Sequence, residues 1–409
     1  MSSCPPRKVR PAELRGAPAT RSSCTAPPRR DLVLMILLIG NYPLERQQSM
    51  ERFAMMMLDG LTAAGIDAEV VRPTPFLGRF VYAGRFVAKW LAYLDKFVFF
   101  RSTLARKLRE RPALVHICDH SNAMYAKAIR DTPVVVTGHD LLAVRGALGE
   151  ATDCPASATG RILQRWIVSG LESAAAVACV SRATLRDAER LVRRTNGKPV
   201  LELMTLGLSY PYRVLSAAET HERLARFPAL NPDTEFVLHV GSNLRRKNRE
   251  GVLRIFAKCK DKWNGSLVFA GDPLSDSLES LGRELGIADR IVEIPNAESE
   301  TLEALYNRAV ALLFPSTFEG FGWPIAEAHA CGCPVLCVDR EPMIEVAGNA
   351  ALVHPVDDEA AFAADLLHLT EPEERARWSA KALENAKRFS TARMISEYLA
   401  LYRSLGVAA

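Results

Sequence analysis

The chain has 409 residues, of which 48% are hydrophobic and 24% charged, close to the composition of an average soluble protein. This composition excludes a disordered, collagen-like or disulfide-rich small protein, and the length predicts two domains. The formal net charge is +5, but residues 1–30 hold seven Lys or Arg against Glu13. The rest of the chain is therefore close to neutral, and we expect no nucleic-acid partner.

Nine cysteines are scattered along the chain, mostly within apolar stretches where a reduced thiol packs as a small hydrophobic group. Cys331 and Cys333 lack the spacing of metal ligands, so we expect no bound metal. Reduced cysteines indicate a cytoplasmic protein. We expect neither a secretory signal nor a membrane span, because no uncharged apolar run reaches about 18 residues.

The first 30 residues contain six prolines and no aromatic residue, which predicts a disordered basic tail. We expect Met35 to be the true start of translation. Folded sequence begins at residue 31 with a continuous apolar run, typical of a parallel strand covered on both faces. A helix is expected at 48–65, and further strands at 67–73, 114–119, 134–140, 176–181 and 200–207. This alternation predicts a doubly wound α/β domain over residues 31–207.

Residues 208–234 interrupt the alternation and contain three prolines, so we expect a linker there. Strands then return at 236–241, 266–271, 291–295, 310–315, 334–338 and 351–355, separated by helices. They predict a second Rossmann-like domain over 235–385, facing the first across a cleft. Residues 386–409 are expected to form a C-terminal helix that packs back on the N-terminal domain.

A basic loop follows the first strand of the second domain. Gly241 ends that strand, and Arg245, Arg246 and Lys247 follow just before a predicted helix. Such cations can neutralise a diphosphate, although a solvated basic loop is the alternative. Neither G-x-G-x-x-G nor a Walker sequence follows any strand, which disfavours a dinucleotide-dependent oxidoreductase.

A second segment, residues 314–332, runs from a strand end through a glycine turn into a helix. Gly320 and Gly322 flank Phe321 and allow a ligand to approach the backbone closely. Glu319 lies in the turn and Glu327 near the start of the helix, and each carboxylate can accept two hydroxyl hydrogen bonds. The alternative is that both are carboxylates favoured by the helix dipole.

The pair Glu319-x7-Glu327 resembles the E-x7-E motif of GT-B glycosyltransferases, above all the retaining family called family 4. Residues 236–248 resemble the phosphate loop of that family, and residues 303–306 and 345–348 resemble two of its helices. The resemblance implies the GT-B fold and sugar transfer from a nucleotide-sugar donor, with retention and without a cofactor or metal. Polysaccharide, lipopolysaccharide or glycolipid assembly is the implied setting.

The resemblance also implies roles for individual residues. Glu319 would hold the donor sugar, and Glu327 would hold the nucleotide ribose. Arg246 and Lys247 would stabilise the leaving diphosphate, with assistance from backbone amides of the second segment. The remaining implied donor contacts are Gly241, Gly320, Phe321 and Gly322. Many family members carry Arg where this chain has Ser242, so more of the phosphate contact falls on Arg246 and Lys247.

The acceptor is expected in the first domain. His139 and Asp140 end a strand and resemble the H-D-L turn of the family, in which the histidine faces the reaction centre. The alternative for His139 is a structural hydrogen bond at the strand end. Asp119, His120 and Asn122 follow the preceding strand and are further candidates for acceptor contact.

Residues 79–111 are rich in Lys, Arg and aromatic residues. Phe86, Trp90, Tyr93, Phe97 and Phe100 recur at helical spacing, and such a face could contact an anionic membrane and a lipid-linked acceptor. A membrane contact would place the protein on the inner face of the membrane, whereas an ordinary amphipathic helix packed on its sheet is the alternative. For the whole chain, a UDP-sugar epimerase of the same fold and a non-catalytic nucleotide-sugar binder stay as alternatives.

Overall fold

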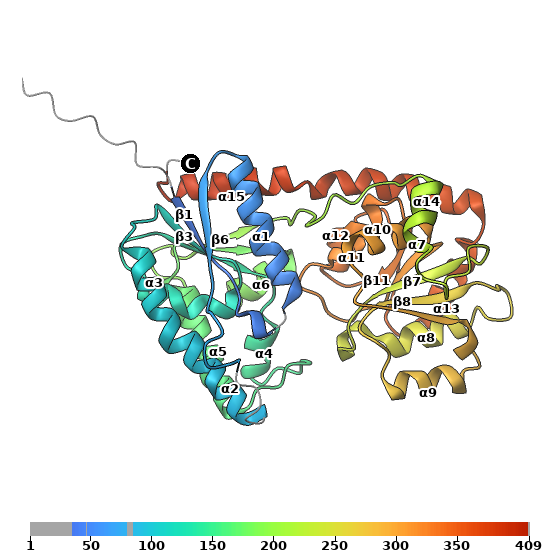
Figure 1. The fold of residues 1–409 in the computed structure, drawn as a ribbon, viewed down its shortest axis with the longest axis horizontal. Helices are drawn as coiled ribbons and strands as arrows, with labels where there is room; N and C mark the ends of the chain where they lie inside the picture. Colours follow the sequence, from blue (N-terminus) through green and yellow to red (C-terminus); the bar gives the residue numbers. More distant parts are fainter. Residues whose placement is uncertain (1–34, 46, 80–84, 408–409) are drawn as a thin grey trace, which may run out of the picture. The chain divides into compact units, whose positions relative to one another are not determined.

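The computed structural model describes residues 35–45, 47–79 and 85–407, and the expected tail lies outside them. Two six-stranded sheets, each entirely parallel, organise these residues (Figure 1). We call the elements around the first sheet the N lobe and those around the second the C lobe. Helices separate the strands in both lobes, so the predicted doubly wound α/β architecture is confirmed.

The N-lobe sheet has the strand order β2-β1-β3-β4-β5-β6. Its strands are β1 (Met35–Ile39), β2 (Asp67–Val71), β3 (Leu114–Ile117), β4 (Val134–Gly138), β5 (Ala176–Cys179) and β6 (Val200–Leu203). Its helices are α1 (Gln48–Ala63), α2 (Arg85–Leu94), α3 (Phe100–Leu108), α4 (Leu142–Ala147), α5 (Ala158–Ser173) and α6 (Arg182–Leu191). The apolar run of β1 is an interior strand between β2 and β3, and Ile36 through Ile39 are fully buried because helices cover both faces.

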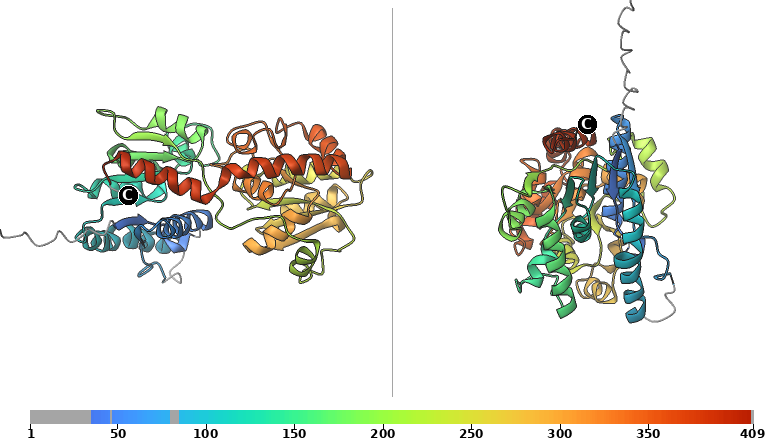
Figure 2. Two further views of the ribbon diagram at one scale, coloured as in Figure 1. Left: turned by 90° about the horizontal axis from the view of Figure 1, so that it is seen from above. Right: turned by 90° about the vertical axis from the view of Figure 1, so that its left-hand side faces the viewer.

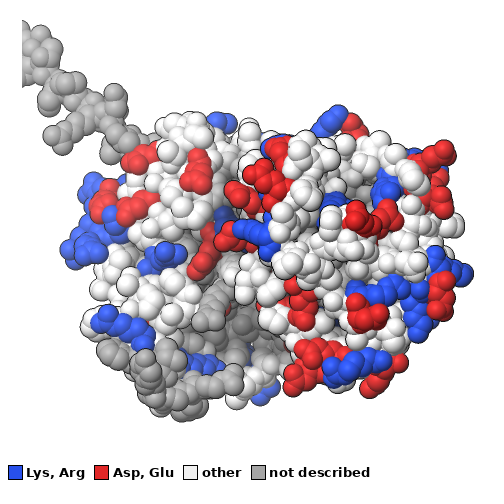
Figure 3. All heavy atoms as spheres, turned by 45° about the vertical axis from the view of Figure 1, so that its right-hand side comes forward, with Lys and Arg blue, Asp and Glu red and all other residues white. Residues whose placement is uncertain are grey.

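The C-lobe sheet has the order β12-β11-β10-β7-β8-β9. Its strands are β7 (Phe236–Gly241), β8 (Ser266–Gly271), β9 (Ile291–Pro295), β10 (Ala311–Phe314), β11 (Val335–Val338) and β12 (Leu352–His354). Its helices are α7 (Ala217–Leu224), α8 (Arg249–Ala257), α9 (Asp276–Glu284), α10 (Ser299–Arg308), α11 (Trp323–Ala330), α12 (Met343–Ala347), α13 (Glu359–His368) and α14 (Pro372–Ala386). Acidic and basic side chains are interspersed on the face shown in Figure 3, in keeping with the small net charge.

Two segments differ locally from the sequence expectation. The expected linker at 208–234 contains α7, which starts at a capping box formed by Ser216 and Glu219. The expected aromatic helix is interrupted between α2 and α3 by a five-residue π-helix, η3 (Asp95–Phe99). The interruption shifts the helical phase, so Phe100 is buried whereas Trp90 is 48% exposed.

The last helix of the chain, α15 (Thr391–Ser404), packs on the N lobe against α1 (Figure 2). The Ile395 side chain fills the space in which a Cβ on Gly60 would lie, only 2.4 Å from Ile395 Cγ1. With any side chain larger than that of glycine at position 60, α1 and α15 could not pack this closely. The contact brings the chain's end into the core that contains β1 and β3.

A buried hydrogen-bond chain fixes α15 to the N-lobe sheet. Tyr402 Oη lies 2.7 Å from His116 Nδ1, and His116 Nε2 lies 2.8 Å from Thr137 Oγ1. Tyr398 Oη continues the chain, 2.9 Å from Thr137 Oγ1. Burial lowers the pKa of His116 to about 3, so the imidazole is neutral and has one donor and one acceptor nitrogen, both of them paired.

Tyr402→Phe should therefore destabilise the protein. It leaves a buried imidazole nitrogen without a partner, which costs roughly 1–3 kcal/mol of unfolding free energy, measurable by urea denaturation. Ser404→Ala on the same helix removes only a local bond to the Leu401 carbonyl and should change stability by less than about 0.5 kcal/mol. Equal stabilities of the two variants would contradict the structural role of the chain.

Candidate active site

A cleft of about 1920 Å³ is lined by both lobes at the carboxyl ends of their strands. In the C lobe its walls come from the loops after β7, β8 and β10 and from the start of α11. In the N lobe they come from the start of α1 and from the loops after β3 and β4. Of the predicted site residues, those that line the cleft are Asp119, His120, His139, Asp140, Gly241, Arg246, Lys247, Glu319, Gly320, Phe321, Gly322 and Glu327.

The two C-lobe loops predicted to bind the donor are joined to each other. The backbone N–H of Thr317 donates to the Arg246 carbonyl at 2.7 Å, and Asn248 Nδ2 donates to the Pro315 carbonyl at 3.2 Å. Asn248 adopts a left-handed conformation and caps the start of α8. The basic turn η5 (Arg245–Lys247) is therefore held directly beside the loop that carries Glu319.

Lys247 and Glu319 form an ion pair inside the cleft. Lys247 Nζ lies 2.7 Å from Glu319 Oε1, and the two side chains are only 13% and 9% exposed. Lys247 Nζ also lies 5.4 Å from the centre of the Phe314 ring. The pair places a cation for an anionic ligand next to a carboxylate that can accept hydroxyl hydrogen bonds.

Arg246 lies next to this pair with hydrogen-bonding capacity to spare. Its side chain is half-buried, and its Nη1 atom is buried without a partner among the described residues. A buried guanidinium nitrogen without a partner is costly, so this group favours an anionic ligand. Arg249, by contrast, is structural, because its guanidinium donates to the carbonyls of Gly241 and Asp272.

Glu327 lies deeper in the wall, with 6% of its surface exposed. Tyr306 Oη donates to Glu327 Oε2 at 2.9 Å, which gives the tyrosine of the 303–306 segment a definite role. Burial raises the pKa of Glu327, while the Tyr306 hydrogen bond and the charge of Arg52 oppose that rise. Arg52 comes from α1, and no motif around it in the sequence predicted that it would lie near Glu327.

The glycine turn before α11 brings the lobes into close approach. Gly322 has a φ of 101°, which favours glycine. A Cβ on Gly320 would lie 2.2 Å from the backbone oxygen of His139 in the N lobe. Trp323 Nε1 donates to the Gly207 carbonyl at 3.0 Å and ties the turn to the segment between the lobes.

His139 is buried at the bottom of the cleft. Its Nε2 lies 2.9 Å from the Cys118 carbonyl oxygen, which can only accept, so Nε2 carries a hydrogen. Burial lowers the pKa of His139, and the neutral ring then leaves Nδ1 as an acceptor. The Phe53 ring packs edge-on against the imidazole at 4.9 Å between centroids. His139 thus makes the structural hydrogen bond considered above and lines the cleft as well.

The Asp119 cluster is only partly directed at the cleft. Asn41 Nδ2 donates to Asp119 Oδ2 at 2.6 Å, and the Ser121 backbone N–H donates to Oδ1 at 3.1 Å. Although burial works against ionisation, these bonds and the neighbouring His120 imidazole hold the pKa of Asp119 far below its usual range. Asn122 is fully buried, donates to Asn41 at 3.3 Å and does not line the cleft.

A buried aspartate that sequence reasoning missed anchors the loop before α1. Asp95, in the π-helix, accepts hydrogen bonds from the Tyr42 hydroxyl at 2.8 Å and from the backbone N–H groups of Leu77 and Gly78 at 2.9 and 2.8 Å. The adjacent Lys96 pairs with Glu45 at 2.7 Å. Two consecutive residues of η3 therefore fix the loop that leads into the cleft.

Two family models cover the two lobes. The model described as Glycosyltransferase Family 4 matches residues 50–199, and the model described as Glycosyl transferases group 1 matches residues 221–385. Together with the fold and the cleft, these matches define a glycosyltransferase of the GT-B class. The resemblance to GT-B glycosyltransferases noted in the sequence is thereby confirmed.

Individual relatives agree with this assignment. The O-antigen chain mannosyltransferase B of Escherichia coli is 30% identical over 178 residues, which is 42% of this chain and about half (46%) of that protein. The D-inositol 3-phosphate glycosyltransferase of Mycobacterium marinum is 27% identical over 375 residues, 83% of this chain and 75% of that protein. HepE of Anabaena, solved with UDP and glucose, superimposes with a TM-score of 0.69 at 16% identity, covering 91% of this chain and 100% of that chain. No helix among the described residues has the length and apolarity needed to cross a bilayer.

The close approach at Gly320 can be tested by adding one methyl group. Gly320→Ala would collide with the His139 carbonyl, so the lobes could not keep their spacing at the cleft. We expect a folded protein whose kcat/KM for sugar transfer falls about a hundredfold, since small displacements of reacting groups have costs of this order. Gly160→Ala on α5, where the added Cβ meets its nearest neighbours at 3.4 Å, is the matched control and should keep full activity. Normal kinetics for Gly320→Ala would show that this approach is not needed for the reaction.

Proposed function

We propose that the protein transfers a sugar from a nucleotide-sugar donor to a saccharide or lipid-linked acceptor, with retention of configuration. The observation that carries the proposal is the Lys247–Glu319 ion pair, with the unpartnered nitrogen of Arg246 beside it. Cations for a diphosphate and a carboxylate for sugar hydroxyls thus lie together in one cleft. The names of the relatives, which act on O-antigen chains and inositol 3-phosphate, support a role in polysaccharide, lipopolysaccharide or glycolipid assembly.

In this proposal the donor occupies the C-lobe side of the cleft. Glu319 accepts hydrogen bonds from the sugar, and Glu327 accepts them from the ribose diol. Arg246 and Lys247 stabilise the negative charge that develops on the diphosphate as it leaves. Because Lys247 is paired with Glu319, the diphosphate on Lys247 and the sugar on Glu319 occupy adjacent positions in the cleft.

The reaction breaks the bond between the anomeric carbon and the donor phosphate oxygen. The acceptor hydroxyl oxygen forms the new bond on the same face, and its proton passes to the leaving phosphate oxygen. His139 and Asp140 lie on the N-lobe side, where the acceptor is expected. The fixed cations carry the charge that a metal would otherwise carry, so we propose that no metal or cofactor takes part.

Two substitutions separate the roles of the ion pair. Glu319→Ala should abolish turnover while nucleoside diphosphate still binds, because it frees Lys247 for the phosphates. Lys247→Ala should weaken diphosphate binding roughly tenfold to a hundredfold, the cost of one charge-assisted contact. Calorimetry with UDP and GDP measures the affinities, and transfer assays with and without EDTA measure turnover.

Lys258→Ala, which removes a surface cation on the far side of α8, controls for the loss of one charge. Near-normal turnover of both site variants would contradict the assignment of the active site. Conversion of free UDP-sugar without any acceptor would favour the epimerase alternative. Binding without any turnover would favour the non-catalytic binder.

We further propose that the N lobe contacts an anionic membrane through an aromatic patch, which we define as Trp90, Tyr93, Phe97 and Trp166. Their rings contact one another in sequence, with centroid distances of 5.7, 5.4 and 5.3 Å. Trp166 lies on α5, so the patch joins α5 to the π-helix and α2. Exposed cations close to these residues in the sequence are Lys89, Arg101, Arg161 and Arg165.

Charge favours a lipid surface as the occupant of this patch. Along α2, η3 and α3 the sequence contains one acidic residue, Asp95. Its carboxylate is buried and already accepts several hydrogen bonds, so it does not repel an anionic surface. A small apolar cavity of about 140 Å³ opens beside Phe97 and Trp166, with Arg101 and Lys127 at its edge. Aromatic rings with a basic border are typical of surfaces that rest in a membrane interface.

Vesicle flotation tests the patch. The protein should float with phosphatidylglycerol vesicles at low salt, and the double variant Trp90→Ala, Trp166→Ala should partition roughly tenfold less, because two exposed aromatic rings are lost. Trp378→Ala, a partly buried tryptophan of the C-lobe helix α14, is the control. A wild-type protein that stays with neither anionic nor neutral vesicles would contradict the proposal.

A further inference from the structure

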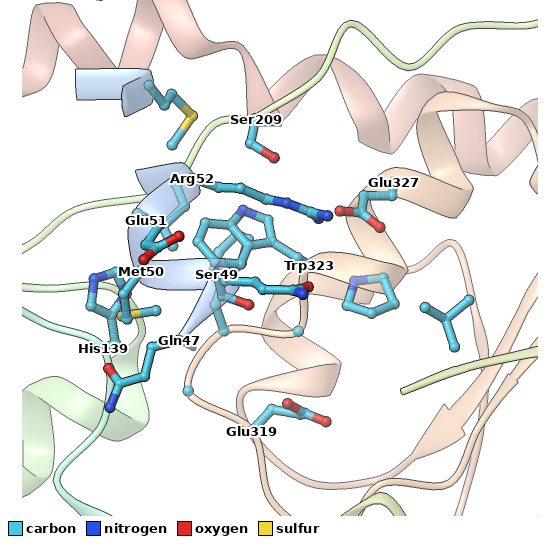
Figure 4. A pocket seen from close by; sticks show the side chains of 18 of the residues that line it. Gln47, Ser49, Met50, Glu51, Arg52, His139, Ser209, Glu319, Trp323 and Glu327 are labelled. Carbon is cyan, nitrogen blue, oxygen red and sulfur yellow. The ribbon is translucent and has the colours of Figure 1, made fainter. Parts of the chain in front are cut away.

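Arg52 is a cation that the N lobe presents to the donor side of the cleft. It lies in the second turn of α1, is half-buried and lines the cleft. Figure 4 shows its side chain extending from α1 toward Glu327 of the C lobe. Among the described residues, Arg52 makes neither a hydrogen bond nor an ion pair, so its guanidinium donors are available to a ligand.

The surroundings of Glu327 explain why a cation belongs there. Glu327 is nearly buried and accepts one hydrogen bond, from Tyr306 on α10. Among the described residues, the other titratable groups that interact with it are Tyr212 from the segment between the lobes, Cys331 at the end of α11, Lys247 from η5 and Arg52 from α1. Lys247 is already paired with Glu319, so Arg52 is the cation that faces Glu327 without a carboxylate partner of its own.

In the first N-lobe loop, the polar side chains of the described residues 41–45 are engaged elsewhere. Asn41 donates to Asp119 and to Gln47, both at 2.6 Å, and the Tyr42 hydroxyl donates to Asp95. Glu45 is paired with Lys96. Residues 41–45 therefore leave few free donors for a phosphate. Arg52, one turn into the following helix, is a donor-rich group that lines the same cleft.

On the basis of the proposed donor site, we infer that Arg52 is a donor-binding residue supplied by the N lobe. Its guanidinium binds the ribose–diphosphate part of the nucleotide opposite Glu327, while Arg246 and Lys247 bind the diphosphate from the C lobe. A planar guanidinium can donate two parallel hydrogen bonds to phosphate oxygens, which a carboxylate-lined wall cannot do. The nucleotide then contacts both lobes, and its binding holds them together across the cleft.

Calorimetry with UDP and GDP tests this inference on the full chain. Arg52→Met keeps roughly the length of the side chain but removes its charge. For whichever of the two diphosphates the wild type binds, the affinity should fall roughly tenfold to a hundredfold in this variant. Arg52→Lys should restore part of the affinity, because it restores the charge without the planar fork. Arg283→Met, on the exposed surface of α9, removes one charge far from the cleft and should bind as the wild type does.

The pH dependence gives a second readout that a loss of packing would not move. Ionised Glu327 can accept hydrogen bonds from both ribose hydroxyls, whereas protonation turns one of its oxygens into a donor and weakens this contact. The charge of Arg52 lowers the pKa of this carboxyl. In Arg52→Met the pKa of Glu327 rises. As the solution is acidified, this variant should therefore lose its affinity for UDP at a higher pH than the wild type does. Arg52→Lys should keep the profile of the wild type.

The two proposals fail in different ways. If neither diphosphate binds the wild type, and Glu327→Gln changes nothing, the proposed donor site is wrong. If the wild type binds and Glu327→Gln weakens binding, but Arg52→Met binds normally with an unchanged pH profile, the role of Arg52 is overturned and the donor site stands.

Discussion

The organisation of the protein depends on one constraint, that both of its sheets are entirely parallel. In a parallel sheet every strand ends at the same edge, so the loops that follow the strands gather there. In the C lobe this brings the basic turn after β7 beside the glycine turn after β10, although about 70 residues separate them in the sequence. In the N lobe it brings the loops after β1, β3 and β4 together. The cleft is the place where these two edges face each other.

The charged groups of the cleft show how such an edge keeps charges that a core would reject. Lys247 and Glu319 neutralise each other, and the Tyr306 hydroxyl donates a hydrogen bond to the buried carboxylate of Glu327. Asp119 and Asp95 are held ionised by several hydrogen bonds each, and neither carboxylate is free to bind a substrate through both oxygens. Of the basic side chains described in the cleft, Arg246 and Arg52 have donors without a partner. The cleft is thus built to take up an anion.

The sequence allowed the fold and the C-lobe residues that line the cleft to be predicted because their signals are local. Apolar runs such as that of β1 mark buried parallel strands, and the spacing of Glu319 and Glu327 spans a single turn and helix. The contacts that were missed join distant parts of the chain. Asp95 accepts from a tyrosine 53 residues away, and the role of Arg52 depends on a carboxylate in the other lobe. Asn122 shows the converse, because a polar residue beside Asp119 turned out to be fully buried.

The position of α15 has a consequence for how the chain is made. On one face of the N-lobe sheet, the core that contains side chains of β1 and β3 also includes Tyr398 and Tyr402 from the last helix. During synthesis from the N-terminus, the first lobe therefore waits for the final residues before its own hydrogen-bond chain can close. A second N-lobe core, on the other face of the same sheet, contains no residue of α15, so this lobe can begin to fold before α15 is made and is completed by it afterwards.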